Sequence, residues 1–199
     1  MATPVTHGFV GLAATATVFG FRAPWRIWVL AVLCATIPDV DVVSFRLGIP
    51  YGSLYGHRGL LHGLPFAALV SVLAAAAAHG RGPGALGRRF LALWGFFFAV
   101  AASHGLLDAM TDGGLGVAFF APVSSERFFL PVRPLVVSPI PISRLLSGGG
   151  LTEWGRRLVR SELIWVWSPA TVLLVAAAAI RRVRRAQTGE RATRRACRG

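Results

Sequence analysis

The residues of this chain that could do chemistry are histidines, aspartates and a few arginines, gathered in four short groups. One group, residues 56–63 (GHRGLLHG), holds two histidines and an arginine just before an apolar run. Mixed imidazole and carboxylate donors suit zinc, iron or manganese, so the pattern predicts a divalent metal site. The candidate metal ligands are His7, Asp39, Asp41, His57, His62, His104 and Asp108.

Two of these groups have a spacing that favours metal binding. His104 and Asp108 are four residues apart, so on a helix they share one face and can reach the same ion. Asp39 and Asp41 follow Pro38 as a DxD sequence, which is a common way to hold divalent cations through carboxylate oxygens. Each pair also has an interpretation without a metal: His104 and Asp108 could form an ion pair at a helix end, and Asp39 and Asp41 could belong to an ordinary loop. Neither pair identifies a metal site alone.

The histidines of residues 56–63 cannot share one face of a regular helix. His57 and His62 are five residues apart, which is about 140° around the helix axis. We therefore expect His57 in a loop and His62 at the start of the next helix. Arg58 between them can give bidentate hydrogen bonds to a phosphate or carboxylate. A glycine-rich turn at the membrane surface, with no ligand, is the alternative interpretation.

Composition indicates which elements must position these groups. Of the 199 residues, 54% are hydrophobic and only 15% are charged, whereas about 25% are charged in ordinary soluble domains. The pattern predicts an all-α integral membrane helical bundle in one domain, residues 1–180. Its five apolar helices are expected at residues 5–21, 25–37, 64–78, 90–107 and 163–180. Prolines and glycines between the last two predict an irregular loop, with a new helix starting at Thr152.

The positive charge is distributed as in a membrane protein. All 21 basic residues are arginines, and eight of them follow Ile180. This bias predicts a multi-pass protein of the cell membrane whose C-terminal tail, residues 181–199, is disordered and cytoplasmic. The same topology puts all seven ligand candidates on the side of the cell membrane that faces away from the cytoplasm. The net charge of +13 is thereby accounted for, and nucleic acid is an unlikely partner.

These motifs together resemble the YdjM-type family of membrane-bound proteins, which are inferred to be metal-dependent hydrolases. The resemblance covers residues 3–180 and rests on residues 6–7, 38–41, 57–62 and 103–108 followed by Thr111, with residues 121–127 matching a later segment. The family is distantly similar to zinc-dependent phospholipase C and P1 nuclease, in which a His-x-x-x-Asp pair on one helix binds zinc. His104 and Asp108 match that pair. Leu61 departs from the small hydroxyl residue expected before the second histidine.

The resemblance implies a hydrolase that holds one or two divalent ions, with zinc as the expected metal. A metal-activated water would attack a phosphoester or ester, and the membrane setting favours membrane lipids as partners and a lipid or lipid-linked substrate. Arg58 and Arg127 would stabilise the developing anion, and Asp112 would support a ligand or act as a general base. Two alternatives stay open: an ion or metal transporter, and a non-catalytic membrane protein whose clustered groups satisfy each other.

Overall fold

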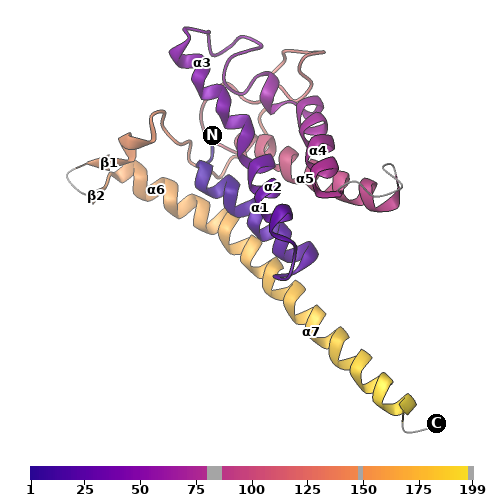
Figure 1. Cartoon of the computed structure of the whole chain (residues 1–199). Coiled ribbons are helices and arrows are strands. Elements are labelled where there is room, and N and C mark those ends of the chain that lie inside the picture. Colours follow the sequence, from indigo (N-terminus) through magenta and orange to yellow (C-terminus); the bar gives the residue numbers. More distant parts are fainter. Residues whose placement is uncertain (80–86, 148–149, 197–199) are drawn as a thin grey trace.

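Helices make up most of the chain in the computed structural model, which describes residues 1–79, 87–147 and 150–196 (Figure 1). The α-helices are α1 (Pro4–Phe19), α2 (Trp25–Thr36), α3 (Val43–Arg46), α4 (Leu64–His79), α5 (Arg88–Ala109), α6 (Glu153–Glu162) and α7 (Ser168–Ala196). The 3-10 segments are η1 (Ile37–Val42), η2 (Leu60–His62) and η3 (Ile142–Leu145), and η4 (Leu163–Trp167) is a π-helix. Strands β1 (Leu146–Ser147) and β2 (Gly150–Leu151) form a short antiparallel pair.

All five predicted apolar segments are helical, but they differ in length. Three continuous helical stretches are long and apolar enough to cross a membrane: Trp25–Arg46, Arg88–Ala109 and Glu153–Thr188. The helices Pro4–Phe19 and Leu64–His79 are apolar but shorter. An α-helix needs about 20 residues to span a hydrocarbon core, so the described residues contain three candidate spans and two shorter apolar helices.

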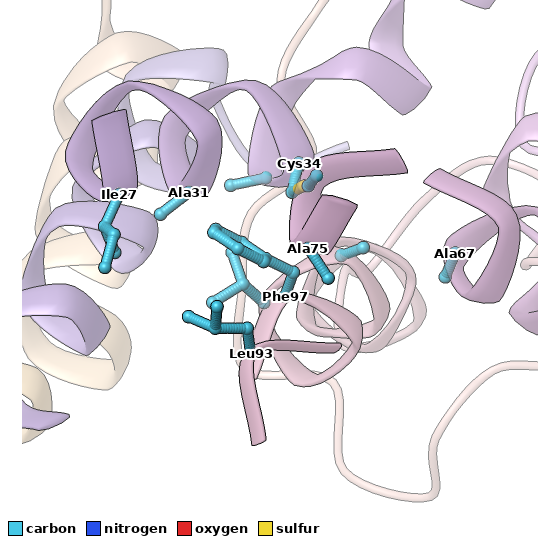
Figure 2. Close-up of a cluster of buried hydrophobic side chains, with 11 residues drawn as sticks. Ile27, Ala31, Cys34, Ala67, Ala75, Leu93 and Phe97 are labelled. Atoms are coloured by element: carbon cyan, nitrogen blue, oxygen red, sulfur yellow. The ribbon is translucent and has the colours of Figure 1, made fainter. Parts of the chain in front are cut away.

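The apolar core lies where α2, α4 and α5 meet (Figure 2). Phe97 of α5 is fully buried there, and its neighbours on the other two helices include the small residues Ala31, Cys34 and Ala75. Small residues let helix backbones approach closely, which is how helices in membranes gain packing energy. Gly11 extends this contact to α1, because a Cβ atom at Gly11 would lie 2.8 Å from the carbonyl oxygen of Ala31.

Residues 181–196 of the basic tail continue the last helix. Helix α7 continues through Ala196 and projects beyond the other helices (Figure 1). The reason is composition: arginine, alanine and glutamine are strong helix formers, so a helix begun in the apolar segment propagates into the basic one. Arg181 donates to the carbonyl oxygens of Ala16 and Thr17 and so caps the C-terminal end of α1. Residues 197–199 of that tail lie outside the described residues.

The segment between α5 and η3 is irregular and folds back onto the helix ends. Isolated bridges join Thr111 to Leu135 and Val117 to Phe128. The N–H of Leu64, at the start of α4, donates to the carbonyl oxygen of Phe119. Helix α6 then begins at Glu153 with Thr152 as its N-cap, as the sequence predicts. The segment therefore ties the start of α4 to the end of α5.

Candidate metal centre

The seven ligand candidates come from separate parts of the chain and meet at one end of the helical bundle. The first helix contributes one, η1 contributes two, the turn before α4 contributes two and α5 contributes two. Six of them are buried residues, and Asp39 is partly exposed as a residue although both of its carboxylate oxygens are buried. By element they are His7 (α1), Asp39 and Asp41 (η1), His57 and His62 (the turn and η2), and His104 and Asp108 (α5).

Four of these residues form a compact donor set. Asp39, His62, His104 and Asp108 each offer one ligand atom, and the four atoms lie within 4.8 Å of one another. The Nε2 atoms of His62 and His104 are 3.0 Å apart. Asp39 Oδ1 is 3.4 Å from His104 Nε2, and Asp108 Oδ2 is 3.4 Å from His62 Nε2. Two imidazoles and two carboxylates thus converge on one small volume.

The acceptor beside the Nδ1 atom of each imidazole determines that Nε2 is the nitrogen facing that volume. His104 Nδ1 lies 2.7 Å from the carbonyl oxygen of Ala35, which can only accept, so Nδ1 carries the proton. His62 Nδ1 lies 3.0 Å from Asp41 Oδ2, which likewise favours a proton on Nδ1. The two Nε2 lone pairs then face each other. Imidazoles that bind metals are oriented in this way, with the other ring N–H held by a carbonyl or carboxylate.

The donor set attracts positive charge even without a metal. Burial lowers the pKa of the His62 imidazole, but Asp108 and Asp41 outweigh that effect and raise the pKa to about 9. A proton on His62 Nε2 would be donated to His104 Nε2 across the 3.0 Å gap. A divalent ion at the same position would replace this proton and neutralise the Asp39 and Asp108 carboxylates. The residues present therefore fit a divalent cation.

His7 lies against this donor set and could supply a fifth ligand. Its ring stacks on that of His104, with centroids 3.7 Å apart and an angle of 16° between the planes. Its Nε2 atom is 3.4 Å from Asp108 Oδ1, which also accepts the backbone N–H of Ala2. Neither ring nitrogen of His7 has a hydrogen-bond partner among the described residues, although both are buried. An unpaired buried imidazole is costly, and coordination would remove that cost.

Asp41 is surrounded by hydrogen-bond donors. Its Oδ1 atom is 2.6 Å from His57 Nδ1, and its Oδ2 atom accepts the backbone N–H of Arg58 and lies beside His62 Nδ1. Asp41, His57 and His62 form a second group that could hold an ion. The two groups share His62. Burial lowers the pKa of His57 more than the neighbouring Asp41 raises it, and His57 Nε2 has no partner among the described residues.

Arg58 is fully buried and its side chain is engaged on three sides. Its Nε atom lies 3.2 Å from Asp108 Oδ2, Nη1 donates to the Gly113 carbonyl, and Nη2 donates to Thr111 Oγ1. The backbone of Arg58 has a φ of 61°, a left-handed conformation that is uncommon outside glycine. The Asp41 carboxylate holds that conformation through the Arg58 N–H. These contacts position Asp108, whereas the sequence predicts contact with a substrate anion.

The other two residues with expected catalytic roles also make structural contacts. The guanidinium of Arg127 donates to backbone carbonyls in the turn that carries His57, those of Tyr51, Ser53 and His57. Asp112 is exposed, and its Oδ1 atom accepts the backbone N–H of Val137. Arg127 therefore fastens the turn to the segment after α5, and Asp112 fastens the end of α5 to residue 137.

Glu162, at the end of α6, supports the site although the sequence interpretation gave it no role. This buried carboxylate accepts the backbone N–H and the hydroxyl of Thr3 and the hydroxyl of Thr6. Trp167 also donates to the Thr6 hydroxyl. Thr3 is the N-cap of α1, so Glu162 fixes the turn that carries His7. An acid directly before an apolar segment is the sequence signal that could have identified it.

Comparison with known proteins agrees with this arrangement of motifs. The model of the family described as YdjM inner membrane protein matches residues 1–185. The chain is also 36% identical to the inner membrane protein YbcI of Escherichia coli (strain K12) over 179 residues, which cover 87% of this chain and 95% of the relative. No solved structure gives a significant match. Neither name states a catalytic activity. The resemblance drawn from the sequence motifs is confirmed, and the chain belongs to the YdjM family of inner membrane proteins.

Proposed function

We propose that this protein is a membrane-bound hydrolase that uses one zinc ion to cleave a phosphoester. The observation that supports the proposal most is the convergence of two correctly oriented imidazoles and two carboxylates within 4.8 Å. Three of the four residues in this set are buried, and the set is built from three segments far apart in the sequence. Ionisable groups at such positions in a membrane protein mark functional sites.

The donor chemistry favours a single zinc ion. Imidazole nitrogens and carboxylate oxygens are common zinc ligands, and a catalytic zinc ion usually has three protein ligands and one position for water. Three of these four donors, or His7 in place of one of them, would therefore be enough to hold the ion. Two carboxylates, Asp39 and Asp108, balance the charge of a divalent ion. Asp41 is less suited to binding a second ion, because donors from His57, Arg58 and His62 already surround its two oxygens.

When bound, a zinc ion polarises a phosphoryl oxygen and makes water a better nucleophile near neutral pH. The chain itself would supply the geometry. Asp41 and the Ala35 carbonyl hold the two imidazoles, and Arg58 holds Asp108. Both carboxylate oxygens of Asp39 are buried, and neither has a hydrogen-bond partner among the described residues. One Asp39 oxygen is therefore free to accept a proton from the attacking water.

Metal content and hydrolysis measured on the same preparations test this proposal. Full-length protein in detergent should contain one zinc per chain by mass spectrometry, and should hydrolyse bis(p-nitrophenyl) phosphate. His104→Ala and Asp108→Ala should each lose both properties. Asp112→Ala is the matched control, because that carboxylate is exposed and contacts the Val137 N–H. The proposal would be refuted if the wild type and both site variants were all found to contain no metal.

A further inference from the structure

A cavity of about 530 Å³ lies next to the donor set. It is partly open, and its volume is in the range of about 300 to 1,000 Å³ that is usual for ligand sites. The residues that matter here are Asp39, Val42, Phe45, Arg46, Ser138 and Ile140. The first four lie on η1 and α3, and the other two precede η3. Asp39 thus belongs both to the donor set and to the wall of the cavity.

The cavity has apolar walls and a few separate polar groups. Val42, Phe45 and Ile140 form apolar parts of the wall. The Ser138 hydroxyl is buried and has no hydrogen-bond partner among the described residues, although the backbone N–H of the same residue donates to the Met1 carbonyl. A buried hydroxyl left without a partner costs about 1 to 3 kcal/mol. A ligand that bonds to the Ser138 hydroxyl would remove that cost.

The charges around the cavity select the ligand. Arg46 ends α3 and brings an exposed guanidinium to the cavity, where it suits an anion. Asp39, a few residues earlier, carries the opposite charge and repels an anion unless a metal ion neutralises it. The cavity therefore fits an anionic head group only when the donor set holds its ion. Val43 and Leu47, which follow Val42 and Arg46 in the chain, are 50% and 68% exposed apolar residues, as expected of a surface that faces lipid.

We propose that this cavity binds a phospholipid, with one hydrocarbon chain against Val42, Phe45 and Ile140 and its phosphate between Arg46 and the metal. The Ser138 hydroxyl donates to an oxygen of the head group. This inference rests on the proposed function, because it makes the bound phospholipid the phosphoester that is cleaved. Water adds to phosphorus, the bond from phosphorus to the ester oxygen breaks, and the leaving alcohol takes a proton.

Photolabelling tests where the chain binds, without relying on turnover. The probe is phosphatidic acid with a diazirine in one acyl chain, added to zinc-loaded full-length protein in maltoside micelles. Cross-links should map to residues 39–46 and 138–141, and unlabelled phosphatidic acid should compete at least tenfold better than diacylglycerol. Chelating the zinc should abolish that preference. Arg46→Gln should reduce it at least threefold.

Variants that fill the cavity make the test specific. Val42→Trp should reduce labelling of these two segments at least fivefold, and Leu47→Trp, on the neighbouring exposed surface, should leave it unchanged. A zinc content equal to that of the wild type shows that Val42→Trp is folded. If Val42→Trp does not fold, Ile140→Trp, which fills the cavity from its other wall, serves as the filling variant in the same labelling test. Labels spread over exposed apolar residues of α7 such as Val172 and Leu173, insensitive to both filling variants, would overturn the inference.

Parallel turnover measurements separate this inference from the proposed function. Hydrolysis of bis(p-nitrophenyl) phosphate without specific labelling would leave the hydrolase standing and reject the lipid site. Specific labelling without cleavage of the labelled lipid or of the soluble ester would reject the hydrolase, and with it the assignment of the lipid as substrate. Labelling together with release of diacylglycerol from phosphatidic acid is the expected result.

Discussion

Replacing Asp41 with asparagine is the most informative single change, because it separates a residue that orients the ligands from a ligand. The carboxylate of Asp41 accepts from the Arg58 N–H at 3.0 Å and lies 2.6 Å from His57 Nδ1 and 3.0 Å from His62 Nδ1. Asparagine has nearly the same shape but only one acceptor oxygen. Its NH2 group would then face a donor, either an imidazole N–H or the Arg58 N–H.

The size of the effect follows from these contacts. Residues that orient a metal ligand change metal affinity by about 10- to 100-fold when they are substituted. That range corresponds to about 1.4 to 2.8 kcal/mol. It matches the loss of one hydrogen bond to a charged group, about 1.5 to 3 kcal/mol. Asp41→Asn should therefore still bind one zinc per chain, with a Kd raised by one to two orders of magnitude.

Competition with a chromophoric chelator measures that Kd on detergent-solubilised protein. Asp39→Asn, which removes a charged ligand candidate, should weaken binding far more than Asp41→Asn does. Asp112→Asn is the matched control and should bind zinc as the wild type does, because its carboxylate contacts only the Val137 N–H among the described residues. Zinc binding by Asp41→Asn that equals the wild type would refute the orienting role. A complete loss of zinc, as deep as that of Asp39→Asn, would instead make Asp41 a ligand.

Three further predictions concern stability. Glu162→Gln should lower the free energy of unfolding in an SDS titration by about 1 to 3 kcal/mol, because an amide cannot accept all three hydrogen bonds; Glu153→Gln, at an exposed position, should change it by less than about 0.5 kcal/mol. Gly11→Leu should lower the thermal midpoint markedly, since even a Cβ atom there meets the Ala31 carbonyl at 2.8 Å; Gly8→Ala, with 3.8 Å of room, should not. Chelating bound zinc should lower the thermal midpoint of the wild type. If free zinc had been kept at 100 times its Kd, the free energy of unfolding should fall by about 2.7 kcal/mol. No shift of the midpoint would mean that the folded state binds no zinc.

The sequence was sufficient for the helices and for the residues that gather at the site. Apolar runs are the strongest signal that a membrane helix leaves, and all five predicted runs are helical. The helical spacing of His104 and Asp108 survives in α5, where both are fully buried. The spacing of His57 and His62 correctly placed them on different elements, but His62 ends η2, two residues before α4, and does not begin that helix as expected.

The roles of the charged residues could not be predicted, because they depend on contacts between distant segments. A guanidinium such as that of Arg58 is typical of anion-binding sites. In the structure, however, it contacts Asp108, Thr111 and the Gly113 carbonyl, all at least 50 positions later in the chain. Nothing local in the sequence indicates that Arg127 reaches the turn that carries His57. Beyond Ile180 two local signals oppose each other: charge density favours disorder, whereas the helix propensity of the same residues favours continuation of α7, which extends through Ala196.

The contact of Glu162 with the first turn of α1 has a consequence for how the protein is made. Every ligand candidate is synthesised by residue 108, so a ribosome has delivered the whole donor set long before it reaches residue 162. Until then the turn that carries His7 lacks the carboxylate that later holds Thr3 and Thr6. Domains that fold during synthesis generally form from the N-terminus onward. Here α1 depends on the end of α6, so a nascent or truncated chain ending before Glu162 holds all its candidate ligands in an unfinished site.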